Sequence, residues 1–175
     1  MKGLIIRQET EADHPAVKKL VKAAFADELH SDKKEHLLVD KLRNTPALVP
    51  ELSLVAVIKN KPVGYILLSK VTIGGNGFVS LALAPVAVSP DYQNNGIGGQ
   101  LIEAAHAKAK ELGYTSIILL GLKDYYPRFG YKPLADFGIY LPFDVPQEYT
   151  MCIELVPNAL QGISGRVHYP KEFFS

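Results

Sequence analysis

The stretch that decides the fold is residues 87–101, which read Ala-Val-Ser-Pro-Asp-Tyr-Gln-Asn-Asn-Gly-Ile-Gly-Gly-Gln-Leu. It continues an apolar run that begins at Phe78, and such a run is typical of a central strand covered on both faces. Beyond it, Ile97, Leu101, Ala105 and Ala109 recur at helical spacing. These residues therefore predict a buried strand that passes through a glycine-rich turn into an amphipathic helix.

The start of that helix predicts an anion-binding site. A helix N-terminus presents amide N–H groups that lack intrahelical partners, together with a partial positive charge. Glycines at positions 96, 98 and 99 remove the Cβ atoms that would keep an anion away from those amides. We expect a diphosphate ligand, and the alternative is a glycine-rich turn that binds nothing.

Two common phosphate-binding motifs fail here at particular residues. A dinucleotide site of the Rossmann type requires G-x-G-x-x-G, and Leu101 stands where the last glycine belongs. A P-loop requires lysine and then serine or threonine after its second glycine, whereas this turn has Gly99 followed by Gln100. The diphosphate must belong to another class of ligand.

The remaining sequence predicts one α/β domain. Val17, Leu20, Val21, Ala24 and Phe25 recur at helical spacing and predict a first helix. A second helix is expected over 32–44, with Leu37, Leu38 and Leu42 facing the core. Strands are expected over residues 4–7, 52–59, 63–73, 78–89, 116–120 and 149–155. Pro85 cannot donate a ladder hydrogen bond, so we expect the central strand to be broken or bulged there.

Composition narrows the classes of function. With 19 Lys and Arg against 18 Asp and Glu, the chain offers no basic surface for a nucleic acid. The five histidines show no metal-site spacing, and the lone Cys152 is expected to be a small core residue. From that spacing we expect no metal site. No signal peptide or membrane span is apparent, so we expect a cytoplasmic protein.

Two motifs carry a resemblance to a known family. Gln93-x-x-Gly96-x-Gly98 and the segment Tyr125–Tyr131 (Tyr-Tyr-Pro-Arg-Phe-Gly-Tyr) resemble elements of the GNAT superfamily of acyl-CoA-dependent N-acyltransferases. The resemblance covers roughly residues 3–155 in the order of its elements. It implies an α/β (α+β) fold whose mixed central sheet is flanked by helices, with splayed parallel strands at the cofactor site. We expect a single domain over residues 1–175, in which 157–175 form an extension of undefined role.

The resemblance also implies where acetyl-CoA binds. The main chain of Val86, Ala87 and Val88 would contact the acetyl-pantetheine arm, and an N–H group there would polarise the thioester carbonyl. The diphosphate would be held by Gln93, Asn94, Asn95, Gly96, Ile97, Gly98, Gly99 and Gln100. Gln93 stands where many members have arginine, so backbone amides should carry most of these contacts.

Two residues are expected to be catalytic. Tyr126 would donate to the departing thiolate, although its neighbour Tyr125 competes for this role. Glu35 is the first choice for the base that deprotonates the amine, ahead of Glu28, Asp32 and Asp40, and the alternative is a solvated helix face. The acceptor would be an amine on a small molecule, a peptide or a lysine. A non-catalytic acyl-CoA-binding module and a homodimer remain open alternatives.

Overall fold

The computed structural model describes residues 2–175 and divides into two compact units. The first unit contains the chain up to Leu68 together with Ala84–Lys108. The second contains Ser69–Leu83 and Ala109–Ser175. Each unit is described by itself.

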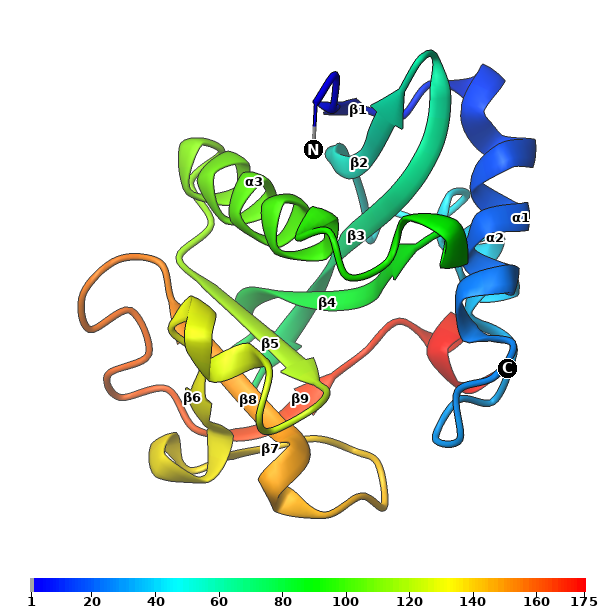
Figure 1. Ribbon diagram of the computed structural model, residues 1–175. Coiled ribbons are helices and arrows are strands. Elements are labelled where there is room, and N and C mark those ends of the chain that lie inside the picture. The colour runs from blue at the N-terminus through cyan, green and yellow to red at the C-terminus, as the bar shows by residue number, and fades with distance from the viewer. Residues whose placement is uncertain (1) are drawn as a thin grey trace. The chain divides into compact units, whose positions relative to one another are not determined.

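Four strands build the sheet of the first unit. They are β1 (Ile5–Gln8), β2 (Leu48–Ile58), the first part of β3 (Lys61–Ile73) and the last part of β4 (Phe78–Val88), in the order β1-β2-β3-β4 (Figure 1). β1 runs antiparallel to β2, with Ile5 opposite Val57. Lys59 and Asn60 have φ angles of 50° and 63°, as a tight turn between twisted antiparallel strands requires.

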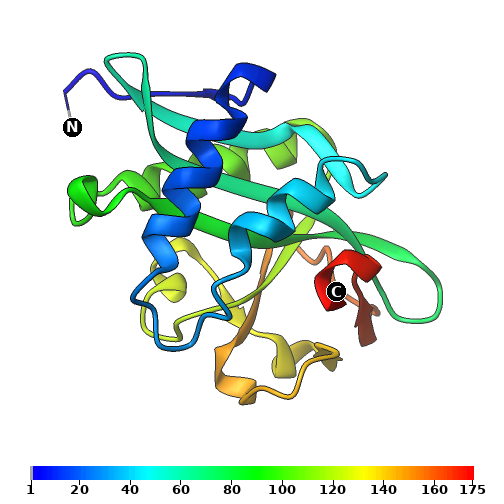
Figure 2. The same ribbon diagram turned by 90° about the vertical axis from the view of Figure 1, so that its right-hand side faces the viewer.

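Helices cover both faces of this sheet. Figure 2 shows α1 (His14–Phe25) and α2 (Glu35–Leu42) lying side by side on one face, with α3 (Ile97–Glu111) on the other. Gly64 in β3 lets α3 approach closely, because a Cβ atom there would lie 3.0 Å from Leu101 Cδ1 and 3.1 Å from Ile97 Cγ2. The start of α3 is therefore seated against the sheet.

The predicted second helix is too long, and Leu37 does not face the core as predicted, whereas Leu42 does. α2 begins only at Glu35, and Leu37 is 39% exposed, whereas Val39 and Leu42 are 2% and 0% exposed. Side chains in the preceding loop bind the backbone there and compete with helix formation: Asp32 Oδ1 accepts the Lys34 N–H at 2.8 Å. Lys33, with a φ of 63°, lies in the left-handed region and cannot continue a right-handed helix.

The second unit contains a mixed sheet. β3 and β4 continue into it and are followed in order by β5 (Ser116–Leu120), β8 (Thr150–Glu154) and β6 (Lys132–Pro133). β5 runs parallel to β4, with Leu81 opposite Ile117, and antiparallel to β8. The predicted fold class, a mixed sheet with a parallel pair flanked by helices, is confirmed.

The C-terminal residues also belong to this sheet. β9 (Gly165–His168) pairs antiparallel with β3 and parallel with β7 (Ile139–Tyr140). The second unit's core includes Val71, Ile73, Ala82, Ile118, Leu134, Cys152 and Val167. Cys152 is fully buried as predicted, and burial raises the pKa of its thiol to about 12. The extension that the sequence left undefined thus provides a strand and part of a core.

Of the two alternatives expected at Pro85, the break is wrong, because β4 runs continuously from Phe78 to Val88; the bulge stays a prediction. A proline removes only its own N–H from a ladder, and the neighbouring residues can still pair. The Ala84–Pro85 peptide bond is cis. Short 3₁₀ helices complete the elements, at Glu11–Asp13, Pro90–Tyr92, Tyr126–Phe129, Leu134–Phe137, Gln147–Tyr149 and Lys171–Phe174. Within residues 2–175, no helix has the length and apolar character needed to cross a bilayer.

Candidate functional site

The strand end that leads into the glycine turn belongs to the first unit. Along β4, Ala87 is buried, whereas Val86 and Val88 are only partly buried. The Ser89 N–H donates to the Val63 carbonyl at 2.8 Å, which ties the end of β4 to β3. Val86 to Val88 therefore lie on a strand that is held in place up to the start of the turn.

Side chains in the turn stabilise the turn itself. Gln93 Nε2 donates to the Val88 carbonyl at 3.0 Å. Asn95 Nδ2 donates to the carbonyls of Tyr92 and Gln93, both at 3.1 Å. Asn94 and Gly96, with φ angles of 65° and 78°, turn the chain toward α3. In this structure the amide groups of Gln93 and Asn95 thus hold the shape of the turn.

The first turn of α3 has backbone amide groups that make no hydrogen bond within the helix. The Gln100 N–H donates to the Gly96 carbonyl at 3.1 Å, which is the first hydrogen bond of the helix. The amides of Ile97, Gly98 and Gly99 precede that bond and belong to the set that helices offer to anions. A Cβ atom built on Gly96 would meet nothing within 4 Å, so the space beside the turn is open. Residues 93–100 thus form one turn that leads into the first amides of α3, with open space beside Gly96.

Tyr126 lies in the second unit, at the start of the 3₁₀ helix Tyr126–Phe129, and is 8% exposed. Its ring packs against Gly121 and meets the rings of Tyr125 and Tyr131 edge to face, with centroids 5.1 Å and 5.7 Å away. Burial is the main reason why the pKa of Tyr126 is raised above its ordinary value, and Tyr125 adds to the effect. The phenol is therefore held firmly and stays protonated at neutral pH.

Tyr125 has a different environment from its neighbour. Its ring is nearly perpendicular to that of Tyr126, at 83°, and the Arg128 guanidinium lies 4.6 Å from its centroid. It lines an open surface hollow of about 330 Å³ together with Leu122, Lys123, Asp124, Arg128 and Tyr149. The two adjacent tyrosines thus face different surroundings, one in the core and one at the surface.

Glu35 is the first residue of α2, in the first unit. Its Oε2 accepts a hydrogen bond from Ser31 Oγ at 2.5 Å. Its Oε1 is buried and has no hydrogen-bond partner among the residues that the structure describes. Of the other carboxylates considered, Asp40 pairs with Arg43 and Lys18, and Asp32 accepts the Lys34 N–H. Glu35 therefore retains a carboxylate oxygen that can accept a proton or an N–H group.

Sequence reasoning missed a buried polar network near the other end of α2. Arg43 Nη2 lies 2.5 Å from Glu9 Oε2, and the two side chains are 10% and 5% exposed. Glu9 Oε1 accepts from Ser53 Oγ at 2.8 Å, and Ser53 Oγ lies 2.7 Å from the Tyr65 hydroxyl. The ion pair between Arg43 and Glu9 anchors the C-terminal end of α2, the helix that begins with Glu35. No local motif signals it, because its members are far apart in the sequence.

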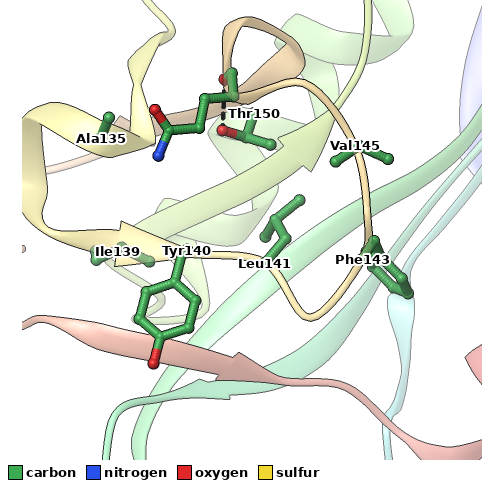
Figure 3. A pocket seen from close by; sticks show the side chains of 8 residues that line it. Ala135, Ile139, Tyr140, Leu141, Phe143, Val145 and Thr150 are labelled. Atoms are coloured by element: carbon green, nitrogen blue, oxygen red, sulfur yellow. Dashed lines mark hydrogen bonds between the residues drawn. The ribbon is translucent and has the colours of Figure 1, made fainter.

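A cavity of about 200 Å³ lies in the second unit, between β7, the loop that follows it and the start of β8 (Figure 3). Its wall includes Ile139, Leu141, Phe143, Val145 and Thr150. Across residues 2–175, no group of three or more His, Cys, Asp or Glu side chains is placed to hold a metal ion.

Comparisons with known proteins agree with this geometry. A family model described as an acetyltransferase (GNAT) domain matches residues 50–133. The uncharacterized N-acetyltransferase YjhQ of Escherichia coli K12 is 38% identical over 122 residues, which are 68% of this chain and 67% of that protein.

Two solved structures are similar over nearly the whole chain. The E. coli GNAT family N-acetyltransferase YhbS, in complex with CoA, superposes with a TM-score of 0.89 at 27% identity, covering 98% of this chain and 92% of that one. A GNAT family acetyltransferase from Brucella melitensis, in complex with acetyl-CoA, gives a TM-score of 0.82 at 34% identity, with 97% of each chain covered.

Proposed function

Because the chain belongs to the GNAT family of N-acetyltransferases, we propose that it transfers the acetyl group of acetyl-CoA to a primary amine by direct attack on the thioester. The observation that carries this proposal is the turn over residues 93–100. There Gly96 leaves open space beside the amides that open α3. Two relatives of similar fold are described in complex with CoA and with acetyl-CoA.

The diphosphate is assigned to backbone groups. The amides of Ile97, Gly98 and Gly99 would donate to its oxygens, since an anion at a helix N-terminus is favoured by both hydrogen bonding and the helix dipole. Gln93 and Asn95 would act by holding the turn, because their side-chain amides bond to backbone carbonyls. The main chain of Val86–Val88 would bind the pantetheine arm and polarise the thioester carbonyl.

Glu35 is assigned the role of base. An alkyl ammonium with a pKa near ~10 must lose a proton before its nitrogen can attack. Among the residues that the structure describes, Glu35 Oε1 is buried without a hydrogen-bond partner. It can therefore accept that proton directly or through a water, while Ser31 holds Oε2. The nitrogen then bonds to the acetyl carbon, the carbon–sulfur bond breaks, the electron pair leaves on sulfur, and the nitrogen releases its second proton to solvent.

Tyr126 is assigned to the leaving sulfur as a hydrogen-bond donor. Even with ordinary pKa values, moving a proton from a phenol to a thiolate is uphill by about 2 kcal/mol. Burial raises the pKa of Tyr126, which makes full transfer less favourable still. The phenol would therefore stabilise the thiolate by donation, and the thiolate would take its proton from solvent.

Release of free thiol tests the proposal. Purified protein is mixed with acetyl-CoA and a broad panel of primary amines, and CoA binding is followed separately by calorimetry. We expect amine-dependent thiol release that Glu35→Gln lowers. Tight CoA binding without turnover of any amine would support the non-catalytic alternative, and absence of CoA binding would contradict both.

A further inference from the structure

One residue of the cavity wall pairs with the strand that leads to the segment carrying Tyr126. This residue is Thr150, the first residue of β8, which lies opposite Leu120, the last residue of β5. The next residue, Gly121, donates its N–H to the Tyr149 carbonyl at 2.9 Å, and the Tyr126 ring packs against Gly121. The cavity wall and Tyr126 are thus linked through one hydrogen-bonded strand end.

The cavity combines an apolar wall with the polar side chains of Tyr140 and Gln147, and its lining favours an uncharged guest that carries an apolar group. Ile139 and Leu141 are almost fully buried, and Phe143 and Val145 complete the apolar wall (Figure 3). None of the residues that line the cavity carries a charge. The Thr150 hydroxyl donates its proton to the Gln147 carbonyl at 2.7 Å, so it does not offer that proton to a bound molecule (Figure 3). A charged group placed here would lose hydration without gaining a partner.

The volume of the cavity indicates the size of the chemical group that can bind in it. Its volume is about 200 Å³. An apolar protein cavity of roughly 150 Å³ is large enough to bind benzene. One six-membered ring therefore fits this cavity.

From these observations we infer that the cavity is an acceptor subsite, and that the acceptor amine carries an uncharged apolar group about the size of a phenyl ring. This inference rests on the proposed function, since it describes the molecule whose amine is acetylated. The ring would be held by the wall of Ile139, Leu141 and Phe143, and the cavity would discriminate among acceptors by the apolar surface that they bury.

The first test compares 3-phenylpropylamine with propylamine, two primary alkyl amines that differ in the ring. We expect kcat/KM to favour the phenyl compound by roughly 10-fold to 200-fold, the range that an apolar pocket usually provides. Ala135 lines the cavity but is itself exposed, so Ala135→Phe should fill the cavity without disturbing the core. It should abolish the preference for the phenyl compound. Ala107→Phe, at an exposed position in α3 outside the cavity wall, is the matched control.

The second test measures binding without turnover. Benzyl alcohol is titrated into the full chain, and the methyl resonances of Ile139 and Leu141 are followed by NMR. Saturable shifts are expected in the wild type and in Ala107→Phe, and they should be lost in Ala135→Phe. Absence of these shifts in the wild type, or their persistence in Ala135→Phe, would overturn the subsite.

The two tests separate this inference from the proposed function. Turnover of both amines at equal kcat/KM would overturn the subsite and leave the acetyltransferase proposal intact. If no amine is acetylated while benzyl alcohol still shifts the Ile139 and Leu141 methyls, the proposed function fails, the cavity remains a binding site for an apolar ring, and its role as an acceptor subsite is withdrawn.

Discussion

The ring of Tyr126 packs so closely over Gly121 that a Cβ atom built on Gly121 would lie 2.4 Å from Tyr126 Cε2. Only glycine at position 121 is compatible with this placement of the ring. The contact supplies a physical reason for glycine here, because it allows the phenol to be buried beside the end of β5.

Gly121→Ala should displace the Tyr126 ring. Overpacking of this kind costs about 1–3 kcal/mol of stability. If Tyr126 donates to the leaving sulfur, kcat should fall by about tenfold or more, because misplacing a catalytic group by an ångström is costly. Gly75→Ala is the control, since a Cβ atom at Gly75 would meet nothing within 4 Å and its φ is not left-handed. Thermal unfolding and steady-state kinetics measure both effects, and an unchanged kcat in a destabilised Gly121→Ala protein would argue against the role of Tyr126.

Tyr126→Phe should lower kcat by about tenfold to a hundredfold, because it removes one donor to a developing charge. The affinity for CoA, measured by calorimetry, should change little, since the ring and its packing remain. Tyr125→Phe removes the hydroxyl of the surface tyrosine and should leave kcat close to the wild-type value. A larger loss of kcat in Tyr125→Phe than in Tyr126→Phe would instead assign the hydrogen bond to the leaving sulfur to Tyr125.

Glu35→Gln should lower kcat/KM for the amine by roughly a hundredfold, the lower end of what a positioned general base contributes. The substitution keeps the size of the side chain and its contact with Ser31. Glu28→Gln, at an exposed position in the loop before α2, is the matched control and should have no such effect. Rates are measured from pH 6 to pH 10, and equal losses in both variants at every pH would exclude Glu35 as the base.

Gly98→Glu should weaken CoA binding by about a hundredfold or more. It places a negative charge and a long side chain at amides that are proposed to hold the diphosphate, where like charges repel. Gly75→Glu adds the same charge in the open β3–β4 hairpin and should leave the affinity unchanged. Calorimetric titration with CoA measures both, and the diphosphate assignment falls if Gly98→Glu binds as the wild type does.

His106 should make folding stability dependent on pH. Burial on α3 lowers its pKa from 6.5 to about 4. Between these values the unfolded chain binds a proton that the folded protein does not, so the free energy of unfolding decreases as the pH falls from about 6.5 to about 4. Urea unfolding at pH 7.5 and pH 5 should show a smaller difference for His106→Gln than for the wild type. The exposed His30, replaced by glutamine, is the control and should retain the wild-type difference.

Features that depend on neighbouring residues could be predicted from the sequence. β5 has the predicted bounds, Ser116–Leu120, and α1 buries Val17, Leu20 and Val21 as their spacing requires. The turn at residues 93–100 was also identified, because its glycines and the periodicity of α3 act over a few residues. These short-range patterns were sufficient for the fold class and for the family.

Features that depend on distant partners required the folded chain. β6 and β7 are two residues long and exist only because β8 and β9 lie beside them. Side-chain packing between elements determines three features of the candidate site, and the periodicity of the sequence does not report such packing. These features are the close packing of Tyr126 on Gly121, the Glu35 oxygen without a partner among the described residues, and the cavity at Ile139. Hydrogen bonding and hydrophobic periodicity along the chain specify elements, whereas burial and close packing between elements specify which side chains are free to react.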